Sequence, residues 1–466
     1  MLFSGIPFLY YFLPATLALY FLAPKRLKNT ALLLCSLVFY GWGEPKYLIL
    51  MLVSIAQGYG FGLLIEKYRA KRQGKLFLTL SVVFSLAMLG YFKYADFFLD
   101  AVRAVTGLSV PLLQIALPIG ISFYTFQILS YAVDVYRGDT SAQRNPIDLA
   151  LYIAMFPQLI AGPIVRYADI AVQLRSRRTT LEDAAEGARR FLVGLAKKIL
   201  LANVLGQLVS AYGAAKAPSV LFSWLYAVAF LLQIYFDFSA YSDMAIGLAR
   251  IFGFRLTENF NYPYCSASIT EFWRRWHISL GSWFRDYLYI PLGGSRVGKG
   301  RLICNLLIVW AATGLWHGAA WTFVLWGLFY ALLLIAEKLA LLPILQRRRA
   351  LGHCYTLLLV LLGFVLFDAP NVSAAIARIG AMFGAGNGGL AGTEALYYLR
   401  SYAVVLALAA VGATPLSKRL LARVRQSRAG ERVLTVLEPV ALTALLVVCT
   451  AYLVDGSFNP FLYFRF

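Results

Sequence analysis

The hydrophobic pattern of the chain consists of long apolar runs separated by short polar or charged segments. A helix needs about 20 residues to cross the roughly 30 Å hydrocarbon layer of a bilayer. Runs of that length lie at 3–23, 47–65, 76–93, 219–240 and 436–455. Transmembrane β-strands would alternate apolar and polar residues over about ten positions, and these runs do not alternate. The pattern therefore predicts transmembrane helices.

Further apolar runs are shorter or are interrupted by polar residues. They lie at 30–43, 115–135, 147–164, 191–211, 302–316, 319–336, 355–367 and 398–414. A helix can stop partway through a membrane only where protein or a water-filled cavity satisfies its backbone. We therefore expect an all-α, polytopic transmembrane bundle of about 11 crossings. Re-entrant or interfacial helices should accompany these crossings, around a central tunnel.

Composition and charge agree with a membrane protein. The 466 residues are 60% hydrophobic and 14% charged, which is too apolar for one soluble core. A net charge of +21 would suggest nucleic-acid binding in a soluble protein, but here the basic residues cluster between apolar runs, as cytoplasmic loops do. These clusters lie at 25–28, 67–75, 166–178, 347–349 and 418–432. We therefore expect them inside the cell, the N-terminus and 368–394 with Asn387 outside, and no nucleic-acid partner.

His317 is the most informative single residue. It lies in the pentapeptide Leu315–Ala319, within the apolar run Leu302–Leu334, in a chain with three histidines. An ionisable imidazole at membrane depth is costly to insert, so it indicates a functional site. A buried histidine that only packs is the alternative. A straight helix would place His317 up to about 24 Å from Arg301, in the membrane interior or its outer half.

His277 is the second candidate for chemistry. It follows Trp273, Arg274, Arg275 and Trp276, a segment without an apolar stripe at helical spacing, so a simple membrane helix is not expected there. Trp and Arg also anchor proteins at the membrane interface. That alternative stays open for the two arginines.

Two aspartates lie within an apolar run, and their spacing argues against a shared role. Asp237 and Asp243 are six residues apart, which puts them about 240° around a helix and about 9 Å along it. They are therefore not an acid/base pair or a two-metal site. Asp237 and Tyr241 share a helix face at i and i+4. A structural hydrogen-bond network that pairs with an arginine is the expected role of these residues.

Several polar motifs together resemble one enzyme family. They are Phe236–Ala245, Glu258–Tyr264, Phe272–His277 and Leu315–Gly318. In this order they are similar to the membrane-bound O-acyltransferase family. Two further segments, Arg285–Gly294 and Asn459–Phe466, resemble the bacterial branch that provides the membrane subunit for alginate O-acetylation. The similarity extends from Phe3 to the last residue.

The resemblance implies acyl transfer from a thioester to a hydroxyl group. His317 would be the base for the hydroxyl proton, since an apolar pocket favours the neutral imidazole that accepts it. His277 would orient or polarise the thioester carbonyl. The resemblance also implies one membrane-embedded acyltransferase domain over 1–466. Within it we expect N-terminal helices at 1–110, a catalytic core at 111–337 and C-terminal helices at 338–466.

The expected donor is acetyl-CoA, whose phosphates need Arg or Lys at a cytoplasmic opening. The candidate donor-binding residues are Arg166, Lys197, Lys198, Arg274 and Arg275. Positive-inside bias alone would also place basic residues there. No HExxH, paired CxxC or EF-hand spacing occurs in the sequence, so we expect no metal and no cofactor beyond this donor substrate.

The resemblance places the protein in the bacterial inner membrane, among membrane lipids. It implies an exported polysaccharide as the final acceptor, reached through a periplasmic SGNH-type acetyltransferase. Acetylation of cellulose or cell-wall sugars stays open. Two other classes were weighed. A transporter or flippase should show matched helix breaks in two halves, which we do not find, and a scaffold of a secretion complex would leave the two histidines without a role.

Overall fold

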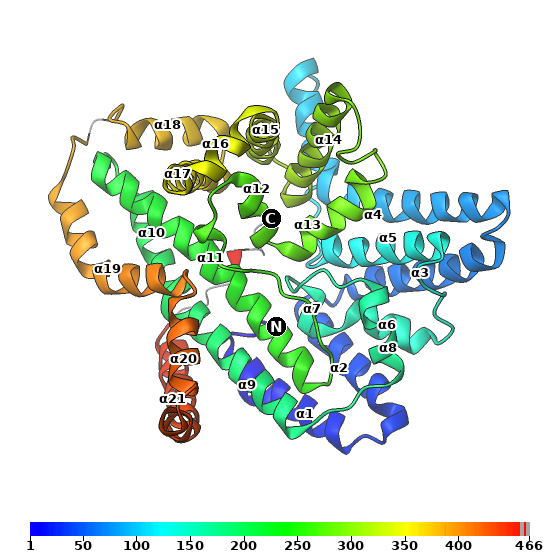
Figure 1. Cartoon of the computed structure of the whole chain (residues 1–466). Coiled ribbons are helices and arrows are strands. Elements are labelled where there is room, and N and C mark those ends of the chain that lie inside the picture. Colours follow the sequence, from blue (N-terminus) through cyan, green and yellow to red (C-terminus); the bar gives the residue numbers. More distant parts are fainter. Residues whose placement is uncertain (387, 457–460, 463–466) are drawn as a thin grey trace. The chain divides into compact units, whose positions relative to one another are not determined.

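The computed structural model describes residues 1–386, 388–456 and 461–462, and every regular element among them is a helix or helical turn (Figure 1). The all-α prediction is confirmed. Asn387, the expected outside position, lies outside the described residues. Of the terminal motif at 459–466, only Phe461 and Leu462 are described.

The chain divides into two compact units. Unit 1 contains Met1–Phe191 and Ser242–Glu258, and unit 2 contains Leu192–Tyr241 and Asn259–Phe466. Two helices pass from one unit into the other, α9 (Leu181–Ala196) and α11 (Val220–Ile251). These boundaries differ from the divisions at 110 and 337 expected from the sequence, and the single-domain description stays a prediction.

In unit 1, α3, α4 and α5 pack on one another (Figure 1). The run 147–164 is interrupted, because Pro157 has no N–H to continue a helix and its ring would clash with a carbonyl one turn earlier. The helices and helical turns of unit 1 are η1 (Phe8–Phe12), α1 (Leu13–Leu22), η2 (Lys25–Leu27), α2 (Lys28–Gly43), α3 (Leu48–Tyr68), α4 (Arg72–Thr106), α5 (Ile121–Arg137), α6 (Pro146–Ala154), α7 (Phe156–Leu159) and α8 (Tyr167–Arg175).

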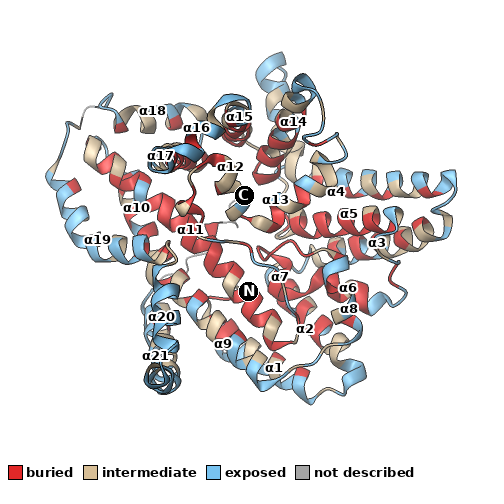
Figure 2. Ribbon diagram, viewed as in Figure 1, coloured by how far each residue is buried: buried red, intermediate tan, exposed pale blue. Residues whose placement is uncertain are grey.

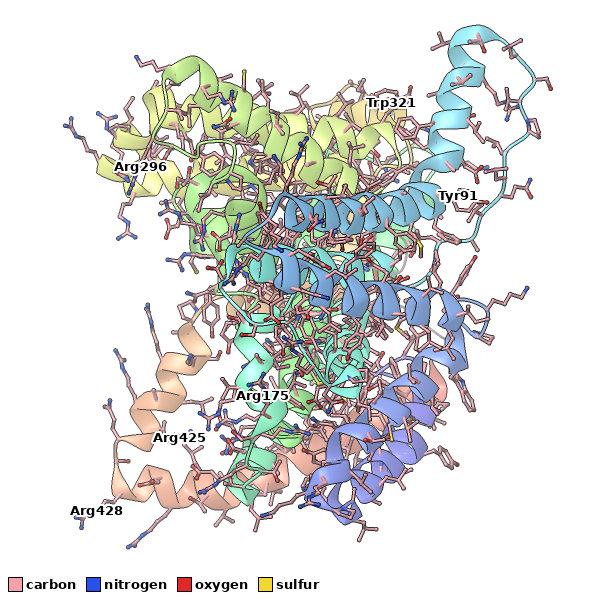
Figure 3. The ribbon with its side chains drawn as sticks, turned by 90° about the vertical axis from the view of Figure 1, so that its right-hand side faces the viewer. Tyr91, Arg175, Arg296, Trp321, Arg425 and Arg428 are labelled. Atoms are coloured by element: carbon pink, nitrogen blue, oxygen red, sulfur yellow. The ribbon has the colours of Figure 1, made fainter. Side chains whose placement is uncertain are left out.

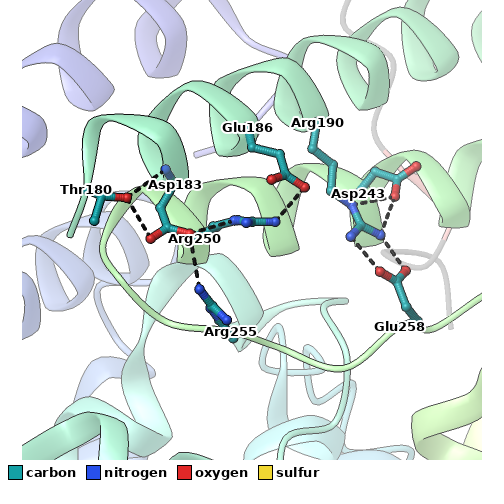
Figure 4. Close-up of polar contacts among 8 residues, drawn as sticks. All are labelled: Thr180, Asp183, Glu186, Arg190, Asp243, Arg250, Arg255 and Glu258. Atoms are coloured by element: carbon teal, nitrogen blue, oxygen red, sulfur yellow. Dashed lines mark hydrogen bonds and ion pairs between the residues drawn. The ribbon is translucent and has the colours of Figure 1, made fainter. Parts of the chain in front are cut away.

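Ion pairs and a close backbone approach join α9 to α11 within unit 1 (Figure 4). A Cβ atom on Gly187 would lie 2.5 Å from the carbonyl oxygen of Gly247, and the reverse distance is the same. Only glycine therefore permits this packing. Beside it, Arg190 donates hydrogen bonds to Asp243 Oδ1 at 2.9 Å and to Glu258 Oε1 at 2.6 Å. These pairs tie the two helices to the segment that follows α11.

Unit 2 contains a tight helical hairpin of α14 and α15. A Cβ atom on Gly314 would lie 2.4 Å from the carbonyl oxygen of Phe323, and one on Gly327 would lie 2.4 Å from that of Trp310. Small residues at these two positions let the helices approach closely. The helices and helical turns of unit 2 are η3 (Lys197–Asn203), α10 (Val204–Ala214), η4 (Pro263–Cys265), α12 (Ile269–Arg275), α13 (Ile278–Phe284), η5 (Arg285–Tyr289), α14 (Lys299–His317), α15 (Trp321–Ala336), η6 (Glu337–Leu341), α16 (Leu342–Arg347), α17 (Arg349–Asp368), α18 (Val372–Met382), α19 (Thr393–Gly412), α20 (Leu416–Arg425) and α21 (Arg428–Asp455).

Eight helices in the described part of the chain are long and apolar enough to cross a membrane. Their number and composition make this a multi-pass membrane protein. They are Leu48–Tyr68, Arg72–Thr106, Leu181–Ala214, Val220–Ile251, Trp321–Arg347, Arg349–Asp368, Thr393–Gly412 and Arg428–Asp455.

Some of the expected crossings are not among these eight helices. The runs 30–43, 115–135 and 302–316 form helices of 16, 17 and 19 residues, which lie near the lower end of the roughly 17–25 residues of a spanning helix. The run 3–23 was expected to be a full span, but its helix covers only Phe8–Leu22. The total of about 11 crossings stays a prediction.

The burial of the long helices differs within the chain (Figure 2). In its most apolar window α11 is 78% buried, whereas α21 is 6% buried. The exposed side chains of α21 are largely aliphatic, among them Val436, Leu437 and Val440. Lipid tails are as apolar as these side chains, so such a helix is stable at the periphery of a membrane protein.

Candidate active site

His317 is the last residue of α14 and is 5% exposed. Its ring centroid lies 5.0 Å from those of Trp316 and Trp326 and 5.3 Å from that of Phe367. These aromatic rings give the imidazole an apolar surround, as the sequence led us to expect.

The direction of α14 places His317 away from Arg296, Arg425 and Arg428 of unit 2. Figure 3 shows Arg296, Arg425 and Arg428 on one side of unit 2 and Trp321 on the opposite side. Because α14 begins three residues after Arg296 and ends four residues before Trp321, it runs from the basic side toward the other.

His277 occupies the turn between α12 and α13 and is 2% exposed. Its φ of 46° is in the left-handed region, which a residue with a Cβ adopts only where surrounding contacts impose it. Burial lowers the pKa of His277 well below its usual 6.5, and nearby His317 lowers it further. At neutral pH the imidazole is therefore uncharged.

The structure brings the two predicted catalytic histidines to the same aromatic ring. The centroid of Trp316 lies 5.9 Å from that of His277 and 5.0 Å from that of His317. Phe238 of α11 covers another side of His277 at 4.6 Å. Residues 40 positions apart in the sequence thus form one buried cluster.

Asn259 holds the turn that carries His277. Its backbone oxygen accepts a hydrogen bond from Ile278 N at 3.0 Å. Its side-chain Oδ1 accepts from Ser279 N at 3.2 Å and from Ser279 Oγ at 2.9 Å, and lies 3.1 Å from His277 Nδ1. Asn259 belongs to the motif Glu258–Tyr264, but no property of the sequence singled it out.

Glu337 fixes the helix that precedes this turn. Its fully buried carboxylate accepts hydrogen bonds from Ile269 N at 2.6 Å, Thr270 N at 2.8 Å and Thr270 Oγ1 at 2.6 Å. A negative charge at a helix N-terminus meets unsatisfied N–H groups and the positive end of the helix dipole. Ser268 also caps α12 by accepting from Glu271 N at 3.0 Å. The N-terminal end of α12 is therefore anchored by two side chains.

A cavity of about 500 Å³ opens beside His277. Buried Trp310 and Thr313 of α14 line it together with His277, and Thr313 precedes His317 by one helical turn. Its other polar lining includes three exposed cations, Arg274, Arg285 and Lys338. The cavity thus combines a neutral imidazole with positive charge.

The five predicted donor-binding residues do not share one location. Arg274 lines the cavity, whereas Arg275 donates to Glu271 Oε1 at 2.7 Å and to the carbonyl oxygen of Asn261 at 3.3 Å. Lys198 lies in a buried ion pair, and Lys197 is half-buried at the start of η3.

Arg166 precedes α8 in unit 1. Sequence reasoning missed Arg285 and Lys338 as cavity residues. Arg285 opens a motif already noted, Arg285–Gly294, which was the available signal. Lys338 follows an apolar run, and nothing in the sequence relates it to a cavity.

The two aspartates have different partners, in agreement with the argument that they do not act together. Asp243 pairs with Arg190 at 2.9 Å. Asp237 pairs with Lys198 at 2.6 Å instead. Tyr241, which shares the face of Asp237, packs its ring 5.0 Å from Phe461.

The chain belongs to the membrane-bound O-acyltransferase family. The family profile matches residues 140–360, which include His277, His317 and all residues that line the cavity. The protein is therefore a membrane-embedded O-acyltransferase.

Similar proteins support this assignment. The chain is 46% identical to the probable alginate O-acetylase AlgI of Azotobacter vinelandii over 83% of its own length and 79% of the relative's. It is 34% identical to the peptidoglycan O-acetyltransferase of Helicobacter pylori over 82% and 80% of the two chains. The teichoic acid D-alanyltransferase of Bacillus subtilis is 28% identical over 54% and 68%.

Proposed function

We propose that the protein takes an acetyl group from acetyl-CoA on the cytoplasmic side of the bacterial inner membrane and passes it outward for O-acetylation of an exported polysaccharide such as alginate. The cavity beside His277 carries this proposal. Its cations Arg274, Arg285 and Lys338 suit the phosphate groups of CoA, since Arg and Lys bind phosphate through charge-assisted hydrogen bonds. The neutral imidazole of His277 suits the thioester end of acetyl-CoA.

The proposed reaction balances without a metal ion or a redox partner. The acceptor hydroxyl oxygen attacks the thioester carbonyl carbon, the C–O bond forms and the C–S bond breaks. His317 accepts the hydroxyl proton and returns it to the leaving sulfur, so that CoA departs as a thiol. Aromatic rings around His317 favour the neutral imidazole that can begin this cycle.

The direction of transfer follows from charge. Basic loops are retained in the cytoplasm, and α14 runs from the basic side of unit 2 toward the opposite side (Figure 3). A CoA body is too polar to cross the bilayer. Only the acetyl group would therefore pass His317, while CoA returns to the cytoplasm.

The names of the relatives support a polysaccharide acceptor. Identity is higher to the alginate O-acetylase than to the peptidoglycan O-acetyltransferase, 46% against 34% over similar lengths. We therefore propose an alginate-like exopolysaccharide, acetylated through a periplasmic SGNH-type transferase. Peptidoglycan is the second candidate, on the similarity to its O-acetyltransferase.

Reconstituted vesicles test the proposal directly. Labelled acetyl-CoA is supplied at the basic-loop face, and the periplasmic partner with polymer only at the other. We expect label on the partner or polymer across the membrane and free CoA thiol on the donor side. Intact labelled CoA on the far side, or transport of sugar without acetyl transfer, would instead identify a transporter.

A further inference from the structure

We propose that Asn259 is the positioning residue of His277 and holds its imidazole in the tautomer with the proton on Nδ1. His277 then offers the lone pair of Nε2 as an acceptor, and does not donate a hydrogen bond to the thioester carbonyl from that nitrogen. This inference rests on the proposed function only for its catalytic consequence. The tautomer itself is a property of the resting protein.

The identity of the atom next to His277 Nδ1 follows from a backbone contact. A backbone N–H can only donate, and Ser279 N lies 3.2 Å from the same atom of Asn259 that approaches the imidazole. That atom must therefore be the carboxamide oxygen and not its nitrogen. An amide oxygen only accepts, so His277 Nδ1 at 3.1 Å must carry the hydrogen.

The hydroxyl of Ser279 does not support the opposite tautomer. It lies 2.9 Å from Asn259 Oδ1 and 3.5 Å from His277 Nδ1, so its proton has the better acceptor in the carboxamide. An unprotonated Nδ1 would also place its lone pair against that oxygen at 3.1 Å. Both contacts favour the Nδ1–H form.

The strained turn makes this arrangement specific. The left-handed backbone of His277 is held by two hydrogen bonds from the next two residues to Asn259, one to its backbone oxygen and one to its side chain. The residue that sets the backbone thus also sets the ring. The lowered pKa of His277 keeps the ring neutral, and a neutral ring with Nδ1 protonated has its only lone pair on Nε2.

This assignment changes the role expected for His277. A group that polarises a carbonyl must donate a hydrogen bond to its oxygen. A neutral imidazole fixed by Asn259 instead accepts, from an N–H or O–H group of the bound donor or acceptor. His277 therefore orients substrate in the cavity as an acceptor, and the thioester carbonyl is polarised by another group.

Nitrogen NMR of the full-length protein in nanodiscs tests the tautomer without any substrate. The chain has three histidines, so ¹⁵N-histidine labelling gives three imidazoles, assigned with His277→Ala and His317→Ala. We expect the His277 ring to show a protonated Nδ1 and an unprotonated Nε2. A protonated Nε2 with an unprotonated Nδ1 would overturn the proposal, whatever the activity of the protein.

Substitutions at Asn259 test its positioning role. Asn259→Leu removes the acceptor, and should abolish the Nδ1–H signature and lower kcat about a hundredfold with little change in the KM for acetyl-CoA. Asn259→Asp keeps an oxygen at the same place, and should restore both. The matched control is Asn261→Leu, because the Asn261 side chain is exposed and its backbone carbonyl, not its side chain, accepts from Arg275.

The outcomes separate this proposal from the proposed function. An unchanged His277 signature in Asn259→Leu would show that Asn259 does not set the tautomer. A lost signature with full activity would show that the tautomer has no catalytic part. If the wild-type protein shows the expected signature but transfers no acetyl group, the proposed function fails while the positioning by Asn259 stands.

Discussion

Two buried polar clusters of unit 2 have the same depth but different chemistry. The histidine cluster consists of Asn259, His277 and Ser279, and the lysine cluster consists of Lys198, Asp237 and Leu462. His277 and Asp237 are each 2% exposed, and Lys198 is 1% exposed. Burial alone therefore does not distinguish a candidate site of chemistry from a structural contact.

Charge and access do distinguish them. In the lysine cluster Asp237 Oδ1 accepts from Lys198 Nζ at 2.6 Å, and its Oδ2 accepts from Leu462 N at 2.7 Å. The ring of Phe461 covers the ammonium at 4.4 Å. The histidine cluster is neutral, and its His277 lines a cavity. A buried charge is stable only with a compensating partner, whereas a neutral imidazole remains able to take up a proton.

The largest loss of activity is expected from substitution of His317, which lies next to the histidine cluster. His317→Ala should reduce acetyl transfer at least a hundredfold, a typical loss when a general base is removed, on the order of 10²–10⁴. Expression and membrane insertion should stay near normal. The measurement is acetylation of polymer by cells or vesicles that contain the variant.

His353→Ala is the matched control for that substitution. His353 is half-buried on α17, and its Nδ1 contacts the carbonyl oxygen of Ser266 at 3.1 Å. We expect near-wild-type activity from it. Near-wild-type acetylation by His317→Ala would end the catalytic assignment of that residue.

The lysine cluster should respond in stability and not in donor affinity. Lys198→Met leaves the buried Asp237 carboxylate without its partner, which typically costs about 3–5 kcal/mol. Thermal unfolding in detergent measures the loss. The double variant Lys198→Met with Asp237→Asn should recover part of it, because the amide oxygen still accepts from Leu462 N.

A raised KM for acetyl-CoA in Lys198→Met, at unchanged thermal stability, would reverse this interpretation. It would make Lys198 a donor-binding residue, as the sequence alone suggested. The lysine cluster would then take part in donor binding and would not be a purely structural contact.

The cations near the histidine cluster should affect donor binding. Arg274 lines the cavity and Arg275 pairs with Glu271, so Arg274→Gln should raise the KM for acetyl-CoA about tenfold, the size of one hydrogen bond to a charged group. Arg275→Gln is the neighbouring control and should change it much less. A change in which polymer is acetylated would instead place Arg274 on the export side.

The smallest expected effect is a dependence of stability on pH. The folded protein holds the pKa of His277 well below 6.5, so the unfolded chain binds a proton more readily than the folded one. Stability is full above about pH 6.5 and falls below it, by at most about 1.4 kcal/mol per pH unit. Unfolding of the wild type and His277→Gln between about pH 5 and 7.5 measures this. If the free energy of unfolding changed equally with pH in both proteins, His277 would not be the source of the pH dependence.

The sequence by itself determined the class of architecture and identified candidate residues for the chemistry. Runs of about 20 apolar residues predicted helices that the structure confirms, because the period and length of an apolar run are local properties. His317 was identified because an ionisable ring in an apolar segment is costly wherever the segment folds, and His277 was identified from the motif Phe272–His277. Helical spacing separated Asp237 from Asp243, and the structure gives them different partners.

Only the tertiary structure decided the partners of these residues. It paired Lys198 with Asp237 across 39 positions, brought Asn259 to His277 across 18, and placed Arg285 and Lys338 on one cavity. It also shortened the first apolar run to Phe8–Leu22. A buried charge or polar atom is stabilised by whichever group the packed helices place within hydrogen-bonding distance, and that distance depends on helix contacts that no local pattern contains.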